Sequence, residues 1–158
     1  MHPNARLVEN LYYSLNAGKP DEMAAAYAPD ATFKDPVFDL TGPDIGDMWR
    51  MFLAPGGDLA VEVSGIGADD DTGKAHWEVR YTYRPTGREV HNVVEAEFQF
   101  LDNLIVRHED TFNLSRWARQ ALGGTGALLG WTGFVQNRIR AKASKQLARF
   151  QSRYKGRI

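Results

Sequence analysis

Residues 74–113 read KAHWEVRYTYRPTGREVHNVVEAEFQFLDNLIVRHEDTFN, and this stretch decides the fold. Apolar and polar residues alternate along it, a pattern that is typical of half-buried β-strands. The turn residues Pro85-Thr86-Gly87 and Asp102-Asn103 divide it into strands at about 74–84, 89–101 and 104–113. Because sequential strands with such short turns pair side by side, we expect an antiparallel meander.

The alternation also predicts which side chains of these three strands face the protein interior, because successive side chains point to opposite faces of a sheet. In each strand one of the two sets is mainly apolar and is assigned to the covered face. The predicted inner set is Trp77, Val79, Tyr81, Tyr83, Asn92, Val94, Ala96, Phe98, Phe100, Leu104, Val106, His108, Asp110 and Phe112. Ile105 falls on the opposite, outer face.

Three polar residues interrupt this apolar surface, namely Asn92, His108 and Asp110. Converging polar groups in an apolar cup are typical of a small-molecule site. The alternative is that they are hydrogen-bonded core residues, as most buried polar groups are, and for His108 alone this alternative is favoured. For His108 together with Asp110 and a carboxylate from an earlier strand, a ligand pocket is favoured, because burying an ionised carboxylate is costly.

Around the meander, the remaining sequence predicts helices on both sides. Before it we expect an amphipathic helix that ends near 16–18, a short helix from Pro20 through Tyr27, a strand at 31–35 that Pro36 stops, a helix from Pro43, and a strand at about 59–66. After it we expect a helix around 116–122, a glycine-rich apolar link at 123–133 and a last helix at about 134–154. The run 123–126 in this link is interpreted as a hinge, because it lacks the lysine and the Ser or Thr of a phosphate-binding loop. Helices followed by a long antiparallel sheet indicate an α+β fold.

Length and composition place the chain among ordinary globular proteins. Its 158 residues suit one domain, and 43% hydrophobic residues can form a core, which argues against disorder. The sequence contains no cysteine, so disulfides and thiol chemistry are excluded. We find no signal-peptide pattern and no run of 18 apolar residues, and we therefore expect a cytoplasmic protein.

The near-neutral net charge of −1 conceals a strong asymmetry. Residues 1–110 contain nine Lys and Arg and all 20 Asp and Glu, whereas residues 111–158 contain ten Lys and Arg and no acid. One interpretation is a tail that binds nucleic acid or a membrane surface. We favour a basic helix that packs on the acidic body, because its basic residues are interleaved with Ile139, Ala143, Leu147, Phe150 and Tyr154 at helical spacing.

Several motifs resemble the nuclear transport factor 2-like superfamily, which includes ketosteroid isomerase and the SnoaL-like polyketide cyclases. They are Leu15-Asn16-Ala17-Gly18, Asp30-Ala31-Thr32-Phe33-Lys34-Asp35-Pro36, the hairpin around Gly87-Arg88, Phe98-Gln99-Phe100 and Ile105–Phe112. The resemblance covers about residues 5–114. It implies a cone-shaped α+β roll of the cystatin-like type, in which a curved mixed or antiparallel sheet packs on the N-terminal helices. We accordingly expect such a domain at 1–114 and a helical extension at 115–158 packed on it.

The resemblance also implies roles for single residues. The general base of ketosteroid isomerase corresponds to Asp35, whereas the two hydrogen-bond donors of its oxyanion hole fall on Leu11 and Ala96, which cannot donate. In that enzyme one of the two donors is a carboxylic acid that stays neutral. In SnoaL-like cyclases a carboxylate late in the sheet acts as acid and base without cofactor or metal, and Asp110 takes that place.

These arguments define the expected site. The predicted catalytic residues are Asp35, His108 and Asp110. The predicted substrate-binding residues are Trp49, Trp77, Tyr81, Tyr83, Asn92, Phe98 and Phe112. Abstraction of a proton next to a carbonyl needs a base and a donor to the enolate oxygen, and His108, Asn92, Tyr81 or Tyr83 could be that donor.

We expect no metal site and no cofactor. His108 and Asp110 are only two ligands, and the histidines at 76 and 91 face the other side of the sheet. Two functions remain as hypotheses. The first is an acid/base isomerase or cyclase that acts on an apolar carbonyl compound. The second is a protein that binds a hydrophobic small molecule without turnover or serves in dimeric assembly.

The outer face of the sheet carries charges of both signs. It contains His76, Glu78, Arg80, Arg84, His91, Glu95, Glu97, Arg107 and Glu109. Because complementary charges on one patch can satisfy a two-fold contact, and because members of the resembled superfamily commonly pair sheet to sheet, we expect a homodimer through this convex face.

Overall fold

The computed structural model describes residues 1–155, except for the side chains at 125 and 127. Six helices and six strands alternate irregularly along these residues. In chain order they are α1 (Pro3–Asn16), α2 (Pro20–Ala24), β1 (Tyr27–Lys34), β2 (Asp39–Thr41), α3 (Pro43–Phe52), β3 (Ala60–Ala68), β4 (Thr72–Tyr83), β5 (Arg88–Leu101), β6 (Leu104–Thr111), α4 (Leu114–Leu122), α5 (Gly124–Leu129) and α6 (Gly133–Lys155). Within the described part of the chain, no helix is long and apolar enough to cross a membrane.

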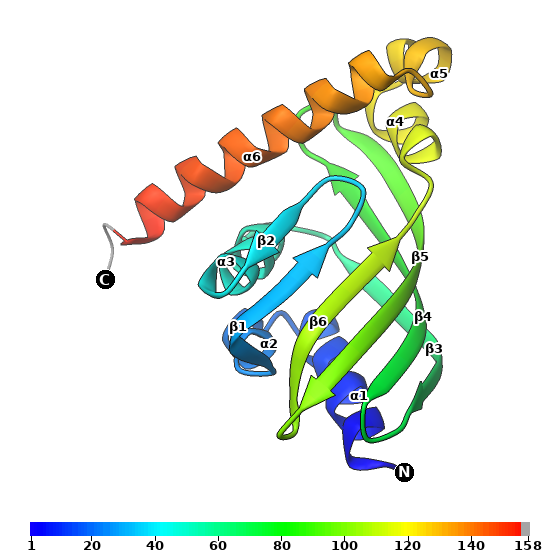
Figure 1. Cartoon of the computed structure of the whole chain (residues 1–158). Coiled ribbons are helices and arrows are strands. Elements are labelled where there is room, and N and C mark those ends of the chain that lie inside the picture. The colour runs from blue at the N-terminus through cyan, green and yellow to red at the C-terminus, as the bar shows by residue number, and fades with distance from the viewer. Residues whose placement is uncertain (156–158) are drawn as a thin grey trace.

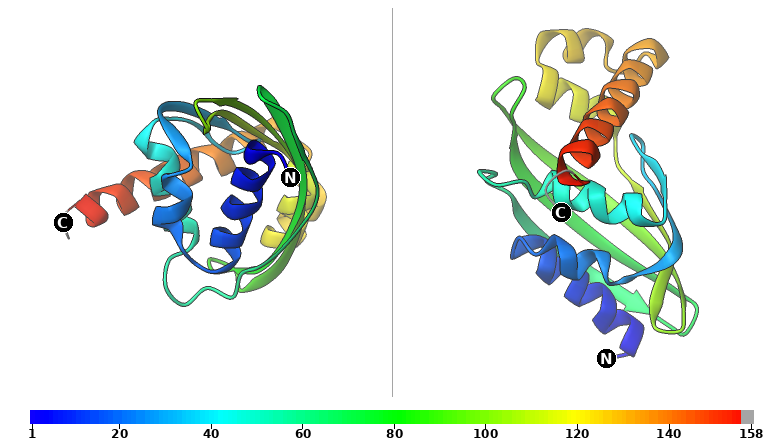
Figure 2. Two further views of the ribbon diagram at one scale, coloured as in Figure 1. Left: turned by 90° about the horizontal axis from the view of Figure 1, so that it is seen from below. Right: turned by 90° about the vertical axis from the view of Figure 1, so that its left-hand side faces the viewer.

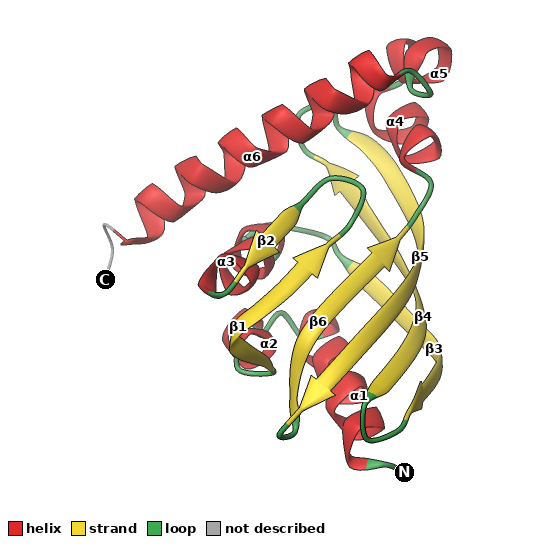
Figure 3. Cartoon of the chain, in the orientation of Figure 1, coloured by secondary structure: helices red, strands yellow, loops and turns green. Residues whose placement is uncertain are grey.

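All six strands form one mixed sheet in the order β2-β1-β6-β5-β4-β3. β4 to β6 make the predicted antiparallel meander, and β3 extends it by pairing antiparallel with β4, while β1 runs parallel to β6 and antiparallel to β2. The sheet curves around α1 like an open cone (Figures 1 and 2), and α1 contacts β3 and β4. Figure 3 shows that the helices gather on the concave side and at the wide end. The α+β fold with a curved mixed sheet is therefore confirmed.

The predicted inner and outer faces are confirmed for β4 and β5, where Trp77, Val94 and Phe98 are each at most 5% exposed. In β6 one assignment is wrong, because Ile105 is completely buried. The register between β5 and β6 shifts near Phe100, which pairs with Ile105, whereas the preceding residue of β5 pairs with Arg107. Such a bulge adds one residue to a strand and so exchanges its faces on one side of the irregularity.

The second helix is shorter than predicted. α2 ends at Ala24, and Tyr27 belongs to β1 instead of to the helix. Pro29 lies inside this strand, at the irregular register between Tyr27 and Thr32, where the sheet can tolerate a residue without an N–H donor. β2 was not predicted, since three residues are too few to show a periodicity. The correction matters because Tyr27, as a residue of β1, is buried against the sheet and reaches His108 of β6.

The run 123–126, which was predicted as a hinge, instead leads directly into a helix, and most of the glycine-rich link forms α5. Its glycines allow close helix packing: a Cβ atom at Gly126 would overlap the carbonyl oxygen of Ala118 in α4, and one at Gly130 would meet the Ala118 methyl group. Asn113 caps α4 by accepting from the amide of Arg116 at 2.9 Å.

α6 runs across the wide end of the cone and contacts α3 (Figure 1). Leu147 is buried at this contact. Arg140 donates from Nε to the carbonyl oxygen of Pro36 at 2.8 Å, and Gln151 donates to Asp44 of α3 at 2.7 Å. These bonds hold the basic helix on the acidic body. The division of the chain at residue 114 stays a prediction.

Candidate functional site

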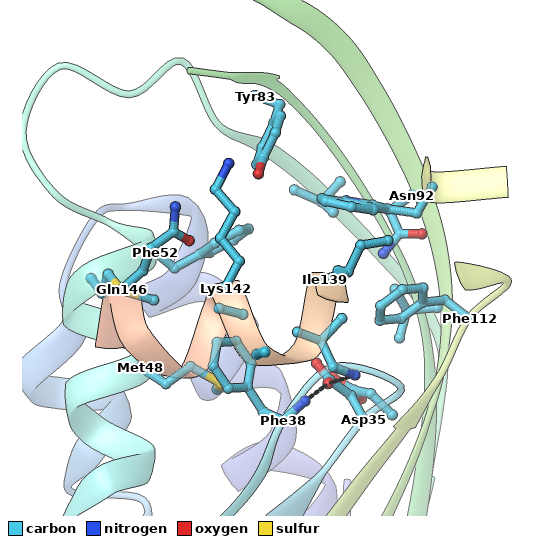
Figure 4. A pocket seen from close by; sticks show the side chains of 18 of the residues that line it. Asp35, Phe38, Met48, Phe52, Tyr83, Asn92, Phe112, Ile139, Lys142 and Gln146 are labelled. Atoms are coloured by element: carbon cyan, nitrogen blue, oxygen red, sulfur yellow. Dashed lines mark hydrogen bonds between the residues drawn. The ribbon is translucent and has the colours of Figure 1, made fainter. Parts of the chain in front are cut away.

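A cavity of about 900 Å³ lies between the concave face of the sheet, α3 and α6 (Figure 4). This volume is within the range of ~300–1,000 Å³ that is typical of small-molecule sites. The walls are mostly apolar and aromatic, with Trp49 and Phe52 from α3 facing Trp77 and Tyr81 of β4. The wide end of the cone is thus a hollow that can hold an apolar molecule.

Most of the predicted site residues meet in this cavity. The lining includes Asp35, Trp49, Trp77, Tyr81, Tyr83, Asn92, Asp110 and Phe112. His108 and Phe98 do not line it, because they lie one layer behind the wall, with 0% and 2% of their surface exposed. The two rings pack on each other with centroids 4.4 Å apart, so neither side chain is placed to touch a ligand directly.

Asp35 is positioned by the sequence next to it. It follows the last residue of β1, and Pro36 cannot continue the strand, so the chain turns. The Asp35 Oδ1 atom accepts from the backbone amides of Val37 at 2.7 Å and Phe38 at 2.6 Å, which fixes the side-chain orientation (Figure 4). Both bonds use Oδ1, and Asp35 lines the cavity, so Oδ2 is left available to a ligand.

Burial raises the pKa of the Asp35 carboxyl from its ordinary 3.8 to about 6. The two backbone amides oppose this rise, the charge of Asp110 adds to it, and His108 opposes it. A carboxyl with a pKa of about 6 is largely ionised at neutral pH, yet it accepts a proton more readily than an ordinary aspartate does. This is the property that a general base needs.

Asp110 ends a chain of buried hydrogen bonds that runs behind the cavity wall. Trp49 Nε1 donates to Tyr27 Oη at 3.2 Å, Tyr27 Oη lies 2.8 Å from His108 Nδ1, and His108 Nε2 lies 2.8 Å from Asp110 Oδ1. Trp77 Nε1 also points at Asp110 Oδ1, at 3.5 Å. The five side chains come from four elements, β1, α3, β4 and β6, which meet only in the fold.

The donors in this chain fix part of its proton arrangement. Trp49 can only donate, so the Tyr27 oxygen accepts from it. The Asp110 carboxylate can only accept, so His108 Nε2 carries the proton that is donated to it. Burial raises the pKa of the Tyr27 phenol, which keeps it neutral. The sequence showed His108 and Asp110 but not Tyr27, which was assigned to a helix.

Two neutral hydrogen-bond donors remain for a ligand in the cavity. Tyr81 Oη accepts from Trp117 Nε1 at 2.8 Å, so the Tyr81 hydroxyl proton is left to donate elsewhere. Burial raises the Tyr81 pKa to about 12, and the phenol therefore stays protonated at neutral pH. Asn92 lines the same wall. Trp117 was missed because nothing in its helical pattern points to the sheet.

α6 forms the roof of the cavity, a role that the sequence did not predict. Val135, Ile139 and Ala143 present an apolar face to it, and this face was predicted only to dock on the body. Three basic side chains of the same helix, Arg138, Lys142 and Lys145, also line the cavity. Among the described residues, no group of three or more His, Asp or Glu side chains is arranged to hold a metal ion.

Deleting α6 from Phe134 onward is expected to lower the melting temperature and to expose the apolar cavity walls. The roof buries Leu147 and closes over Trp49 and Phe52, all of which would then meet water. Melting temperature and the fluorescence of a dye that binds apolar surface measure the two effects. A deletion that starts after Tyr154 is the control. The role of α6 as a roof would be contradicted if the truncated protein had the same melting temperature as the full chain and bound no more dye.

Comparison with known families finds one match, a model of the SnoaL-like domain, which covers residues 8–108. This is more than half of the chain and contains Asp35 and His108. No curated protein matches the chain at a significant level.

Similar folds occur among solved structures. An LEH-like epoxide hydrolase from M. tuberculosis is 22% identical with a TM-score of 0.64, over 80% of this chain and 95% of that one. A candidate polyketide cyclase from Xanthomonas campestris pv. campestris is 22% identical with a TM-score of 0.63, over 75% and 96%. A candidate ketosteroid isomerase from Kribbella flavida is 20% identical with a TM-score of 0.57, over 70% and 78%. At these identities the likeness shows a shared fold.

Proposed function

Because the chain belongs to the SnoaL-like domain family, we propose that it is a cofactor-free acid/base enzyme, an isomerase or cyclase that acts on an apolar carbonyl compound. The observation that carries the proposal is the environment of the Asp35 carboxyl. Its carboxyl is held by two backbone amides, has a pKa of about 6 and lines an apolar cavity of about 900 Å³. Candidate isomerases and cyclases among the solved structures share this fold.

The reaction starts when Asp35 Oδ2 removes a proton from the carbon next to the substrate carbonyl. The electron pair of the C–H bond moves into the carbonyl, and the resulting enolate oxygen accepts a hydrogen bond from the Tyr81 hydroxyl or the Asn92 amide. Asp35, now a neutral acid, returns the proton to a different carbon in an isomerisation. In a cyclisation the enolate carbon instead attacks a second carbonyl of the same molecule, and Asp35 protonates the new alkoxide.

Asp110 is the alternative base, and the hydrogen bonds favour Asp35 over it. Asp110 Oδ1 already faces two donors, His108 Nε2 and Trp77 Nε1. The Asp110 carboxylate thereby orients the His108 ring and the Trp77 side chain in the cavity wall. Its negative charge also raises the pKa of Asp35, which makes Asp35 a stronger proton acceptor than an ordinary aspartate.

A hydrogen-exchange assay tests the proposal without knowledge of the natural substrate. The probe is 1-tetralone, an apolar ketone with exchangeable protons at a single carbon, incubated with the protein in D₂O and followed by NMR. We expect exchange faster than in buffer, with a rate that rises with pH through about 6 and then levels as Asp35 becomes ionised.

The second candidate function is binding without turnover. One observation favours it: Leu11 and Ala96 stand where ketosteroid isomerase has its oxyanion donors, and both are buried apolar residues here. The same assay separates the two functions. A ketone that binds in the cavity but exchanges no faster than in buffer would support the binding protein and reject the enzyme.

We further propose that two copies pair through the convex face of the sheet, as the mixed charges of this face predict. On it, Glu78 bridges His76 at 3.0 Å and His91 at 2.7 Å, and His76 also contacts Glu95. These side chains lie on β4 and β5, and the two glutamates raise the pKa of His76, so this face carries both signs for a second copy to complement. Light scattering at micromolar concentration is expected to give twice the chain mass of 17.7 kDa, and a species of 17.7 kDa would reject the dimer.

A further inference from the structure

The charges that line the cavity are separated by sign. The two acids, Asp35 and Asp110, lie on the side of the sheet, and the three bases, Arg138, Lys142 and Lys145, all belong to α6. Every other lining residue is uncharged. In Figure 4 the Lys142 amine extends toward Tyr83 and away from Asp35. A ligand in the cavity therefore meets the two carboxylates on the side of the sheet and the three bases on the side of α6.

The three bases have no acidic partner among the described residues. The ion pairs of the structure involve Lys19, Arg50, Arg107 and four histidines, and none includes a side chain of α6. Residues 111–158 contain no Asp or Glu that could supply one locally. Arg140, by contrast, binds the carbonyl oxygen of Pro36 and is used to hold the helix in place. Arg138 lies over the Phe134 ring, with the guanidinium carbon 5.8 Å from its centroid.

We propose that the ligand of this cavity is an apolar molecule that carries one carboxylate, with that carboxylate beside the three bases of α6. The inference rests on the proposed function, because it places the reacting carbonyl of the same molecule at Asp35. The three bases are exposed residues, but the apolar cavity wall beside them excludes part of the water that would otherwise screen their attraction to an anion. The carboxylates of Asp35 and Asp110 repel an anion, so an orientation that keeps the ligand carboxylate beside the bases of α6 is favoured.

Decanoate and decanol test this assignment, because they share the apolar chain and differ in charge. At pH 7.5 we expect isothermal titration calorimetry to show decanoate binding about tenfold more tightly than decanol, the size of effect that one charged hydrogen bond supplies. In a triple variant, Arg138→Met, Lys142→Met and Lys145→Met, the preference should disappear while decanol affinity stays within about twofold. Lys155→Met removes a charge from the same helix outside the cavity, and it should keep the preference.

Equal affinities of the wild-type protein for decanoate and decanol would overturn the inference. So would a preference that survives the triple variant, or no binding of either probe. Decyltrimethylammonium should bind more weakly than decanol, and tighter binding of this cation would equally overturn it. The exchange assay uses a neutral ketone, so exchange without a decanoate preference rejects this inference alone. A decanoate preference without exchange rejects the enzyme and keeps the anionic ligand.

Discussion

Replacing Asp35 with asparagine is expected to slow the exchange of 1-tetralone protons by about 10²–10⁴-fold. The amide has the shape of the carboxyl, and its oxygen can still accept from the amides of Val37 and Phe38, so the turn should persist. What is lost is the proton acceptor. The binding of decanol should therefore change little, and calorimetry on the same sample separates lost chemistry from lost shape.

The same substitution is expected to stabilise the protein at neutral pH. The folded-state pKa of Asp35, about 6, lies above its ordinary 3.8, so the folded protein binds more protons than the unfolded chain between these values. The free energy of unfolding then falls as pH rises from about 4 to 6 and stays lower above 6. A difference of about two pKa units corresponds to roughly 3 kcal/mol, an upper bound for the stability gained by Asp35→Asn at pH 7.5.

Urea unfolding at pH 4 and at pH 7.5 measures this effect. The Asp35→Asn variant should match the wild type at pH 4 and exceed it at pH 7.5. Asp39→Asn, which removes an exposed carboxylate from β2, is the matched control for the change in net charge. An Asp35→Asn protein that is less stable than wild type at pH 7.5 would show that the carboxylate stabilises the fold, and the assignment of Asp35 as the base would be wrong.

Replacing Asp110 with alanine is expected to destabilise the protein by about 3–5 kcal/mol. The substitution leaves His108 Nε2–H and Trp77 Nε1–H without their acceptor, and His108 is completely buried. A loss of this size lowers the melting temperature by roughly 10 °C in a chain of this length. Asp110→Asn keeps an oxygen acceptor at the same place and should lose much less.

The rate at which the Asp110→Asn variant exchanges the 1-tetralone protons then shows whether Asp35 or Asp110 is the general base. If Asp35 is the base, this variant should keep exchange within about tenfold of wild type, because Asp110 acts only through His108 and the electrostatics of the cavity. Loss of exchange in Asp110→Asn with retention in Asp35→Asn would assign the base to Asp110. If both asparagine variants unfold, the carboxylates are structural partners of their neighbours and neither is the base.

The sheet and most of the cavity wall could be predicted from the sequence. When one face of a strand is covered, every second side chain is apolar, and this alternation is visible in the sequence. Trp77, Val79 and Val94 are apolar at every second position since one face of their strands is covered. Asp110 was recognisable as an acid on an apolar face. Asp35 was recognised through its motif, and the proline after it explains locally why the strand stops there.

Contacts between distant segments decided the rest. The bulge that buries Ile105 depends on how β5 and β6 pair, and Tyr27 reaches His108, 81 residues away, only because β1 lies beside β6. Likewise, the pattern of α6 showed an apolar face but not what that face covers. An amphipathic helix encodes that one side is buried, whereas the surface that buries it, here the mouth of a cavity, is set by the packing of the whole chain.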